Sequence, residues 1–258
     1  MEINKIYNEN CIDTINKMPD NFIDLMVTSP PYNVGIWYDS YEDRIPWKDY
    51  YQFLENVLSA LYPKMKEDGR LCINHYLSLG SGKKGSKQEN GVRTSPISEI
   101  NQLAQKIGYN HHSMAVWPDI TLSKKTAWGS WKSASAPYIN SPFEAILFLY
   151  KNKWKKENRG ESTIEKLDFV KLTRGRWEMK TERKQLTKAN FPVELPLNCI
   201  NLLSYKGDLI YDPFMGAGTT ALACVMSGRN YIGSEISTNY CEVAEKRIDD
   251  YKNSLIIT

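Results

Sequence analysis

The feature that most constrains the fold is a short apolar run that ends in two consecutive prolines. Residues 22–27 read Phe-Ile-Asp-Leu-Met-Val, the length and composition of one buried strand, and residues 29–32 read Ser-Pro-Pro-Tyr. Because proline fixes φ and has no N–H to donate, the strand must end there and the backbone that follows must be stiff. A hydroxyl, a carbonyl outside any sheet ladder and an aromatic face suit a flat ring that carries an exocyclic amine. The alternative is an ordinary strand followed by a proline-rich turn.

A second stretch, near the other end of the chain, has the composition of a nucleotide-binding loop. Residues 212–220 read Asp-Pro-Phe-Met-Gly-Ala-Gly-Thr-Thr. The glycines let the backbone pass close to a ligand, and a helix predicted from Thr219 begins with its N-terminus aimed at that ligand. The next predicted strand ends at Glu235, about 20 residues beyond Gly216, which is the distance at which an acid meets ribose hydroxyls in nucleotide-binding sheets.

Together, the two stretches resemble the amino-methyltransferases of DNA, which transfer a methyl group from S-adenosylmethionine to the exocyclic nitrogen of cytosine or adenine. Residues 29–32 match the family's catalytic motif, Asp/Asn/Ser-Pro-Pro-Tyr/Phe, and residues 212–218 match its cofactor motif, acid-Pro-Phe-x-Gly-x-Gly. The catalytic motif precedes the cofactor motif, as in the family's β order. The resemblance covers nearly the whole chain and implies a Rossmann-like α/β methyltransferase fold with a mostly parallel, doubly wound sheet.

The resemblance also implies which residues form the site. The expected catalytic residues are Ser29, Pro30, Pro31 and Tyr32. The residues expected to bind S-adenosylmethionine are Asn10, Cys11, Asp212, Phe214, Gly216, Gly218, Thr219, Thr220 and Glu235. The family usually has an acid before the cysteine of the first pair, and Asn10 takes its place here. No metal ligand is expected.

The expected reaction follows from the electronics of the amine, whose lone pair is delocalised into the ring. Hydrogen bonds from its two N–H groups to Ser29 Oγ and the Pro30 carbonyl would favour a tetrahedral nitrogen and direct the lone pair at the methyl donor. The base would be flipped out of the duplex and stacked on Tyr32, and the proton would leave to water after transfer. Serine at the first motif position resembles cytosine N4 enzymes, so cytosine N4 is favoured over adenine N6.

Length and charge indicate one α/β domain with a basic insertion. The 258 residues divide into a catalytic half at 1–150, a basic region at 151–188 and a cofactor half at 189–258. The basic region carries thirteen Lys and Arg against six Asp and Glu, whereas the net charge of the whole chain is only +3. Its position matches the family's target-recognition region, so we expect it to contact double-stranded DNA. A solvated surface loop is the alternative.

Three other segments are candidates for contacts near the DNA. Residues 34–41, rich in aromatics, could close as a flap over a flipped base. Residues 80–91 are glycine, serine and lysine, and they predict a loop near DNA or a disordered one. Residues 126–137 place small side chains between two tryptophans and could line the base pocket. For the first and third segments, packing of the aromatics against the chain itself is an equal alternative.

Cysteine usage and the N-terminus exclude several classes. The five cysteines are scattered and never form Cys-x-x-Cys, so neither a disulfide framework nor a zinc site is predicted, and none follows a proline as in the C5 methyltransferases of cytosine. No signal peptide and no apolar run of about 18 residues is found, so we expect a cytoplasmic protein. The resemblance adds a cognate restriction endonuclease and a homodimer as expected partners.

Two other function classes remain open from the sequence. Gly216, Gly218 and Ala221 followed by Glu235 satisfy the loose fingerprint of NAD-dependent oxidoreductases. Hydride transfer, however, requires neither the Pro-Pro-Tyr loop nor the Asp-Pro-Phe that precedes the glycines. A nucleic-acid-binding protein without activity would not need a nucleotide pocket, so cofactor binding separates it from an enzyme.

Overall fold

The computed structural model describes most of the 258-residue chain. The described residues are 1–35, 37–38, 41–79, 94–118, 132, 134–135, 137, 139, 141–180 and 191–256. The polar loop predicted at 80–91 and most of the tryptophan-flanked segment at 126–137 therefore lie outside the described residues, as do residues 181–190 of the basic region and its junction with the cofactor half. In the expected flap, the short strands β3 (Trp37–Tyr38) and β4 (Tyr41–Glu42) pair antiparallel.

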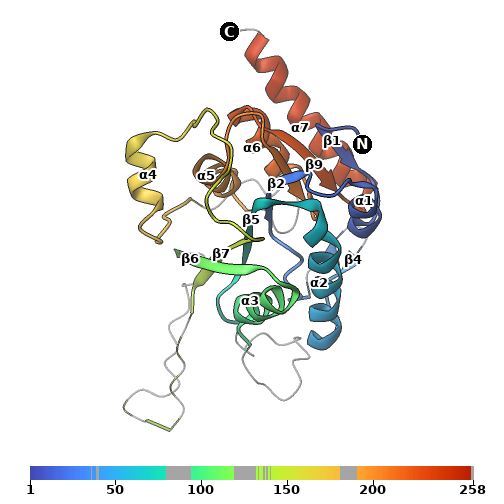
Figure 1. The fold of residues 1–258 in the computed structure, drawn as a ribbon. Helices are drawn as coiled ribbons and strands as arrows, with labels where there is room; N and C mark the ends of the chain where they lie inside the picture. The colour runs from blue at the N-terminus through green and yellow to red at the C-terminus, as the bar shows by residue number, and fades with distance from the viewer. Residues whose placement is uncertain are drawn as a thin grey trace.

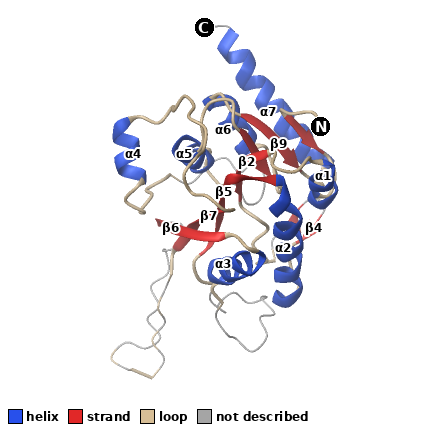
Figure 2. Cartoon of the chain, viewed as in Figure 1, coloured by secondary structure: helices blue, strands red, loops and turns tan. Residues whose placement is uncertain are grey.

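A seven-stranded sheet forms the centre of the molecule, in the order β1-β9-β8-β2-β5-β7-β6 (Figures 1 and 2). The first five strands in that order are parallel, and β7 runs antiparallel to both of its neighbours. The mostly parallel sheet predicted from the sequence is therefore confirmed, with one reversed strand. The strands are β1 (Lys5–Tyr7), β2 (Ile23–Thr28), β5 (Met65–Tyr76), β6 (Asn110–Pro118), β7 (Phe143–Tyr150), β8 (Leu209–Asp212) and β9 (Asn230–Ser234).

Helices cover both faces of this sheet, as a doubly wound fold requires (Figure 1). One face carries α1 (Cys11–Lys17), α2 (Trp47–Leu61, extended by a 3₁₀ turn at Tyr62–Lys64) and α3 (Pro96–Ile107). The other face carries α5 (Glu194–Leu203), α6 (Thr219–Ser227) and α7 (Thr238–Ile256), with the short α4 (Lys166–Leu172) packed against α5. In the described part of the chain, no helix is both long and apolar enough to cross a membrane.

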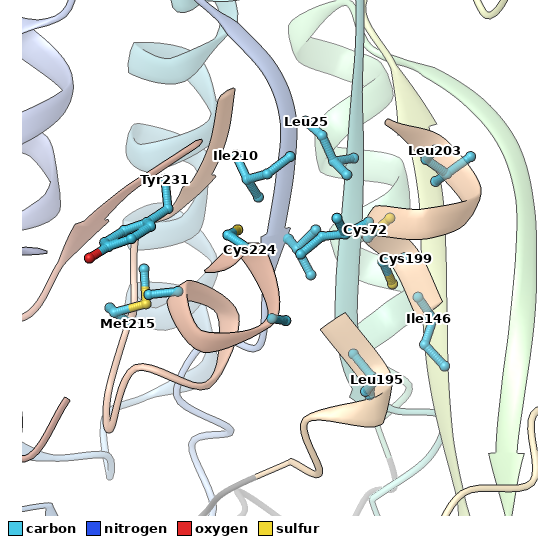
Figure 3. Close-up of a cluster of buried hydrophobic side chains, with 14 of the residues drawn as sticks. Leu25, Cys72, Ile146, Leu195, Cys199, Leu203, Ile210, Met215, Cys224 and Tyr231 are labelled. Atoms are coloured by element: carbon cyan, nitrogen blue, oxygen red, sulfur yellow. The ribbon is translucent and has the colours of Figure 1, made fainter. Parts of the chain in front are cut away.

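The side chains of each strand point alternately to the two faces of the sheet and so contribute to a hydrophobic core on each face. In β2, Leu25 and Val27 face α5 and α6, whereas Met26 faces α2. Because successive side chains of a strand point to opposite faces, a strand covered on both sides must be apolar at nearly every position, which is the composition found here. Figure 3 shows the first of these cores, in which side chains of several strands meet α5 and α6.

The site lies at the switch point of the sheet, between the neighbouring strands β8 and β2. The two strands are parallel neighbours, with Leu25 opposite Ile210 and Met26 opposite Tyr211. From β8 the chain continues through α6 to β9, and from β2 it continues through α2 to β5, on the opposite side. The loops after Thr28 and Asp212 therefore diverge at the carboxyl edge of the sheet, which is where open α/β sheets bind ligands.

Two element boundaries depend on local geometry. The helix α3 begins at Pro96, directly after Ser95. The strand β5 runs through Asp68 and Gly69, because a register shift opposite β2 accommodates the extra residues. The strand β1 and the helix α4 were not predicted, since runs of three and seven residues carry little periodicity.

Candidate active site

The buried carboxylate of Asp212 joins the two sequence motifs. Thr28 Oγ1 donates to its Oδ1 at 2.6 Å, and Thr220 Oγ1 donates to its Oδ2 at 2.6 Å. The Phe214 N–H also donates to Oδ1, at 3.0 Å. Burial raises the pKa of Asp212 to about 6, although the hydrogen bonds from the two threonines favour the charged form. Asp212 thus holds the catalytic strand, the cofactor loop and α6 together, and both of its carboxylate oxygens accept hydrogen bonds from the protein.

The cofactor loop contains two glycines that have different structural roles. Gly216 has φ of +53°, and a Cβ built there would meet nothing within 4 Å, so this position faces open space. Gly218 has φ of +75°, and a Cβ there would come within 2.7 Å of Ala244 Cβ in α7. Gly218 is therefore needed for helix packing, whereas Gly216 leaves room above the backbone for a ligand.

Glu235 meets this loop from the end of β9. Its Oε2 accepts from the Gly216 N–H at 2.8 Å, and its Oε1 accepts from the Ser237 N–H at 2.8 Å. Its own N–H donates to the Tyr7 carbonyl at the end of β1. The structure therefore brings the predicted pair Gly216 and Glu235 into contact at the carboxyl edge of the sheet, where the expected contact of this half-buried acid with ribose hydroxyls stays a prediction.

The first predicted pair, Asn10 and Cys11, opens α1 beside the same edge. Asn10 is exposed and its Oδ1 accepts from the Ile12 N–H at 2.9 Å, so its amide caps the helix. The Cys11 side chain is buried in the core between the sheet and α2, where burial raises its pKa to about 12. The Cys11 side chain is therefore turned away from the edge, so the expected contact with the cofactor stays a prediction for its backbone.

The remaining residues predicted to bind the cofactor are Thr219, Thr220 and Phe214. Thr219 Oγ1 accepts from Arg247 at 2.9 Å, and Thr220 Oγ1 donates to Asp212, so both hydroxyls help to fix α6. Their contact with the cofactor stays a prediction. The Phe214 ring is half-buried and lies 5.7 Å from the Phe53 ring of α2. Phe214, Thr28 and Pro30 line a narrow apolar crevice where the two motifs approach α2.

The catalytic loop is held by its own polar groups. Ser29 is half-buried, and its Oγ donates to the Tyr32 hydroxyl at 2.8 Å. Asn33 has φ of +55°, and its amide exchanges two hydrogen bonds of 2.9 Å with the backbone of Ile45. Asn33 was not among the predicted site residues, but it anchors the loop that carries Ser29, Pro30 and Pro31.

The structure gives Tyr32 a role in addition to the predicted one. Its ring packs against His75 and Tyr76, with centroids 4.6 and 4.7 Å away, and the residue is only 8% exposed. Its stacking on a flipped base stays a prediction. Burial, and then the charge of Glu144, raises the pKa of the Tyr32 hydroxyl well above its ordinary value, so the hydroxyl stays protonated.

Two buried residues that sequence reasoning missed complete this network. The Tyr32 hydroxyl donates to Glu144 Oε2 at 2.7 Å, and Asn74 Nδ2 donates both to the Tyr32 oxygen at 2.7 Å and to Glu144 Oε2 at 2.6 Å. Next to Asn74, burial lowers the pKa of His75 to about 3, so that imidazole is neutral. A signal existed in the sequence, since Asn74 directly follows the apolar run at residues 71–73 and Glu144 directly precedes the apolar run at residues 145–149.

The first part of the basic region lies at the opposite edge of the sheet. Lys156 pairs with Asp24 at 2.9 Å and with Asp208 at 3.1 Å, at the amino ends of β2 and β8. Trp154 stacks on His112 at 3.6 Å between ring centroids, with the Arg70 guanidinium over its ring. The expected DNA contact is therefore corrected for Trp154 and Lys156, because internal partners occupy both side chains.

The later part of the region returns toward the catalytic edge. Gly175 and Trp177 bond to the backbone of Val116, so the chain runs parallel beside β6. Trp177 is buried and donates to the Leu172 carbonyl, which excludes it as a stacking surface for a base. Arg174 and Arg176 are exposed and remain candidates for contacting DNA.

Neither a metal centre nor a disulfide is found in the described part of the chain. No group of three or more His, Cys, Asp or Glu side chains there could hold a metal ion. All five cysteines are buried free thiols. The residues at the carboxyl edge that fit a nucleoside-type cofactor are instead the open backbone at Gly216, the Glu235 carboxylate and the Phe214 ring.

This sheet order, with the loops after β2 and β8 brought together at the switch point, is the fold of the S-adenosylmethionine-dependent methyltransferases. The family model described as DNA methylase matches residues 23–246, so the chain belongs to the N6/N4 DNA methylase family. It is an S-adenosylmethionine-dependent DNA methyltransferase that acts on amino groups. Membership of this family excludes the oxidoreductase considered from the glycine pattern.

Individual relatives agree with the family assignment. The type II methyltransferase M.MjaVI of Methanocaldococcus jannaschii is 40% identical over 189 residues, which cover 70% of this chain and 92% of that protein. M.BglI of Bacillus subtilis is 25% identical over 303 residues, covering 96% of this chain and 86% of its own.

Solved structures show the same fold at low sequence identity. TTHA0409 of Thermus thermophilus, complexed with S-adenosyl-L-methionine, superposes with a TM-score of 0.74 at 22% identity, covering 95% of this chain and 92% of its own. PvuII DNA methyltransferase, described as cytosine-N4-specific, superposes with a TM-score of 0.68 at 17% identity, covering 96% of this chain and 91% of its own.

Proposed function

We propose that this protein methylates the exocyclic amino nitrogen of a base flipped out of double-stranded DNA, with N4 of cytosine as the preferred target. The observation that carries the proposal is the position of Ser29 at the carboxyl end of β2, tied to the cofactor loop through Thr28 and Asp212. Ser29 donates its only hydroxyl proton to Tyr32, so the lone pairs of its Oγ are available to accept an N–H of the base.

The chemistry at Ser29 is one of orientation. An exocyclic amine is a weak nucleophile because its lone pair is delocalised into the ring. Acceptance of its two hydrogens by Ser29 Oγ and the Pro30 carbonyl favours a tetrahedral nitrogen with a directed lone pair. The S-adenosylmethionine cofactor supplies an electrophilic methyl group. Ser29 is neutral and forms no covalent intermediate, so the base is held and not attacked by the protein.

Cofactor binding falls to the residues at the same edge of the sheet. Glu235 is positioned to accept ribose hydroxyls, the Phe214 ring offers an apolar face, and Gly216 leaves space above the backbone. Asp212, Thr219 and Thr220 support these residues from below through their hydrogen bonds. This division predicts that variants of the first group weaken cofactor binding, and that variants of the second group lower stability as well.

Base flipping is part of the proposal, since an amine paired inside a duplex cannot reach Ser29. The exposed Arg174 and Arg176 lie on the segment that runs beside β6 toward the catalytic edge. Arginine neutralises phosphates and can also bind guanine edges in bidentate fashion. We therefore propose that this segment, and not residues 151–160, contacts the DNA.

Serine as the first residue of the catalytic motif favours cytosine N4, and adenine N6 is the alternative. The test is nucleoside mass spectrometry of DNA from cells that express the protein. N4-methylcytosine is the expected product, and N6-methyladenine would establish the alternative. If neither appears while the folded protein binds S-adenosylmethionine, the proposed function is wrong.

We further propose that the enzyme acts in a restriction-modification system, because the relatives M.MjaVI and M.BglI are type II methyltransferases. The proposal predicts that DNA from expressing cells resists one sequence-specific endonuclease that cuts control DNA. The expected homodimer is tested separately, by light scattering after gel filtration with and without a DNA duplex.

A further inference from the structure

Glu144 is a buried acid next to the catalytic loop that belongs to neither sequence motif. It is the second residue of β7, the one reversed strand of the sheet, so it enters the catalytic edge from the opposite direction. Only 6% of the residue is exposed, and its Oε2 lies 2.7 Å from the Tyr32 hydroxyl and 2.6 Å from Asn74 Nδ2. A carboxylate in such a place requires hydrogen bonds to the charged form, and these two donors supply them.

The direction of every hydrogen bond in the network follows from this one carboxylate. An ionised carboxylate can only accept, so Tyr32 must donate its single hydroxyl proton to Glu144. The Tyr32 oxygen then accepts, and it receives the Ser29 hydroxyl at 2.8 Å and Asn74 Nδ2 at 2.7 Å. Ser29 Oγ is left as an acceptor, which is the role that binding of an amine N–H demands.

The side-chain amide of Asn74 enforces the same arrangement. Its Nδ2 directs one hydrogen to Tyr32 and one to Glu144, while its Oδ1 is buried without a hydrogen-bond partner among the described residues. An amide turned the other way would place its oxygen against the carboxylate. The unpaired Oδ1 is thus the consequence of holding both donors on Tyr32 and Glu144.

We propose that Glu144 is a positioning residue for methyl transfer, which fixes Ser29 as an acceptor and receives, through Tyr32, the proton that the methylated amine loses. This inference rests on the proposed function. The chain Ser29, Tyr32 and Glu144 joins the half-buried base-binding loop to a charge inside the protein, through hydrogen bonds of 2.8 and 2.7 Å.

The proton transfer balances along this chain. After the nitrogen has gained the methyl group it carries one positive charge and at least one N–H bond. That N–H bond breaks as a bond to Ser29 Oγ forms, the former Ser29 proton passes to the Tyr32 oxygen, and the former Tyr32 proton passes to Glu144 Oε2. The amine and the two hydroxyls end neutral, and Glu144 ends as a neutral carboxylic acid that returns its proton to water before the next turnover.

The experiment compares Glu144→Gln and Tyr32→Phe with the wild type. Both variants keep the size of the side chain and remove the relay, and Tyr109→Phe is the matched control because it also removes a buried tyrosine hydroxyl, one bonded to the Leu58 carbonyl. Single-turnover methyl transfer to duplex DNA is measured in H₂O and in D₂O. Dissociation constants for S-adenosylmethionine and for the duplex are measured on the same preparations.

We expect the single-turnover rate constant to fall about 100-fold in Glu144→Gln and in Tyr32→Phe, the size typical of lost acid–base assistance. Both dissociation constants should stay within about twofold of wild type, and the ratio of the rates in H₂O and D₂O should rise, because proton departure then limits the reaction. Tyr109→Phe should match the wild type in all of these measurements.

Three outcomes would overturn the inference. Wild-type rates in both variants would show that Ser29 needs no relay. Slower transfer with an unchanged isotope ratio, or with equally weakened cofactor binding, would show that the network is only structural. If Glu144→Gln does not fold, Tyr32→Phe decides alone. A wild-type protein that methylates no DNA base would contradict the proposed function instead, which separates the two failures.

Discussion

Thr28 Oγ1 lies 2.6 Å from Asp212 Oδ1, although the two residues are 184 positions apart in the chain. Thr28 is the last residue of β2, directly before the catalytic loop, and Asp212 is the last residue of β8, directly before the cofactor loop. This hydrogen bond sets the distance between the groups that hold the base and those that hold the cofactor. In-line transfer of the methyl group depends on that distance, because a small displacement of the reacting atoms lowers the rate by a large factor.

Replacing Thr28 by Val removes this hydrogen bond while keeping the β-branched shape. Because Asp212 then loses one of three donors in a buried place, we expect the free energy of unfolding to fall by about 1–3 kcal/mol. Urea unfolding followed by circular dichroism measures it. Thr173→Val is the control, since Thr173 is exposed and, among the described residues, its hydroxyl bonds only to the backbone of its own helix. Equal losses in the two variants would contradict the role of Thr28.

Stability should depend on pH through Asp212. The folded protein raises the pKa of this carboxyl to about 6, above that in the unfolded chain, because burial disfavours the charge. A raised pKa means that the folded state binds the proton more tightly, so this contribution is fully present below about pH 4 and is lost as pH rises through 6, by up to about 3 kcal/mol.

The variant Asp212→Asn isolates that contribution, because an amide does not titrate. Urea unfolding of wild type and variant at a series of pH values between about 4 and 7 should give a difference in unfolding free energy that changes with pH. A difference independent of pH over this range would show that Asp212 does not titrate as inferred.

Replacing Ser29 by Ala removes one acceptor for the amine. We expect the single-turnover rate constant to fall by about 100-fold or more, with the dissociation constant for S-adenosylmethionine unchanged, because Ser29 acts on the base and not on the cofactor. Ser254→Ala, on the exposed end of α7, is the matched control. Near wild-type methylation of a plasmid by Ser29→Ala would refute the assignment.

The two glycines of the cofactor loop should respond differently to alanine. Gly218→Ala places a Cβ within 2.7 Å of Ala244, so overpacking should lower the unfolding free energy by about 1–3 kcal/mol, with added strain from the positive φ. Gly216→Ala meets no neighbouring atom, so its cost should be limited to the left-handed backbone, about 1–2 kcal/mol, while cofactor affinity falls. Thermal unfolding and calorimetry with S-adenosylmethionine compare the two variants directly.

The parts of this molecule that the sequence predicted well are those coded locally. The prolines after β2 and the glycines after β8 fix their own backbones, and the family motif then places both loops at one edge of a doubly wound sheet. Glu144 and Asn74 could not be assigned in this way, because their function exists only where β5 and β7 lie side by side. Polar ends of apolar strands predict such a site only after the strand order is known.

The basic region shows the same limit for charge. Its net charge predicts one DNA-binding surface, yet Lys156 pairs with Asp24, which is 132 positions away. A sequence shows how many lysines a segment has, but not which of them meet acids after folding. Surface charges without such partners are the ones left to bind phosphates.

This division predicts opposite effects for two charge deletions in the region. The double variant Arg174→Ala, Arg176→Ala removes exposed charges beside β6, and the weak surface pair of Arg176 with Glu178 should have little effect on stability. If both arginines bind phosphates, the slope of log affinity for duplex DNA against log salt should become about 2 units shallower.

Lys156→Ala should instead leave that slope unchanged and destabilise the fold, because Asp24 and Asp208 lose a buried partner. Fluorescence anisotropy with a labelled duplex at several salt concentrations, together with urea unfolding, measures both. If Lys156→Ala lowers the salt slope and the arginine pair does not, the DNA lies on the amino edge of the sheet and the proposed interface is wrong.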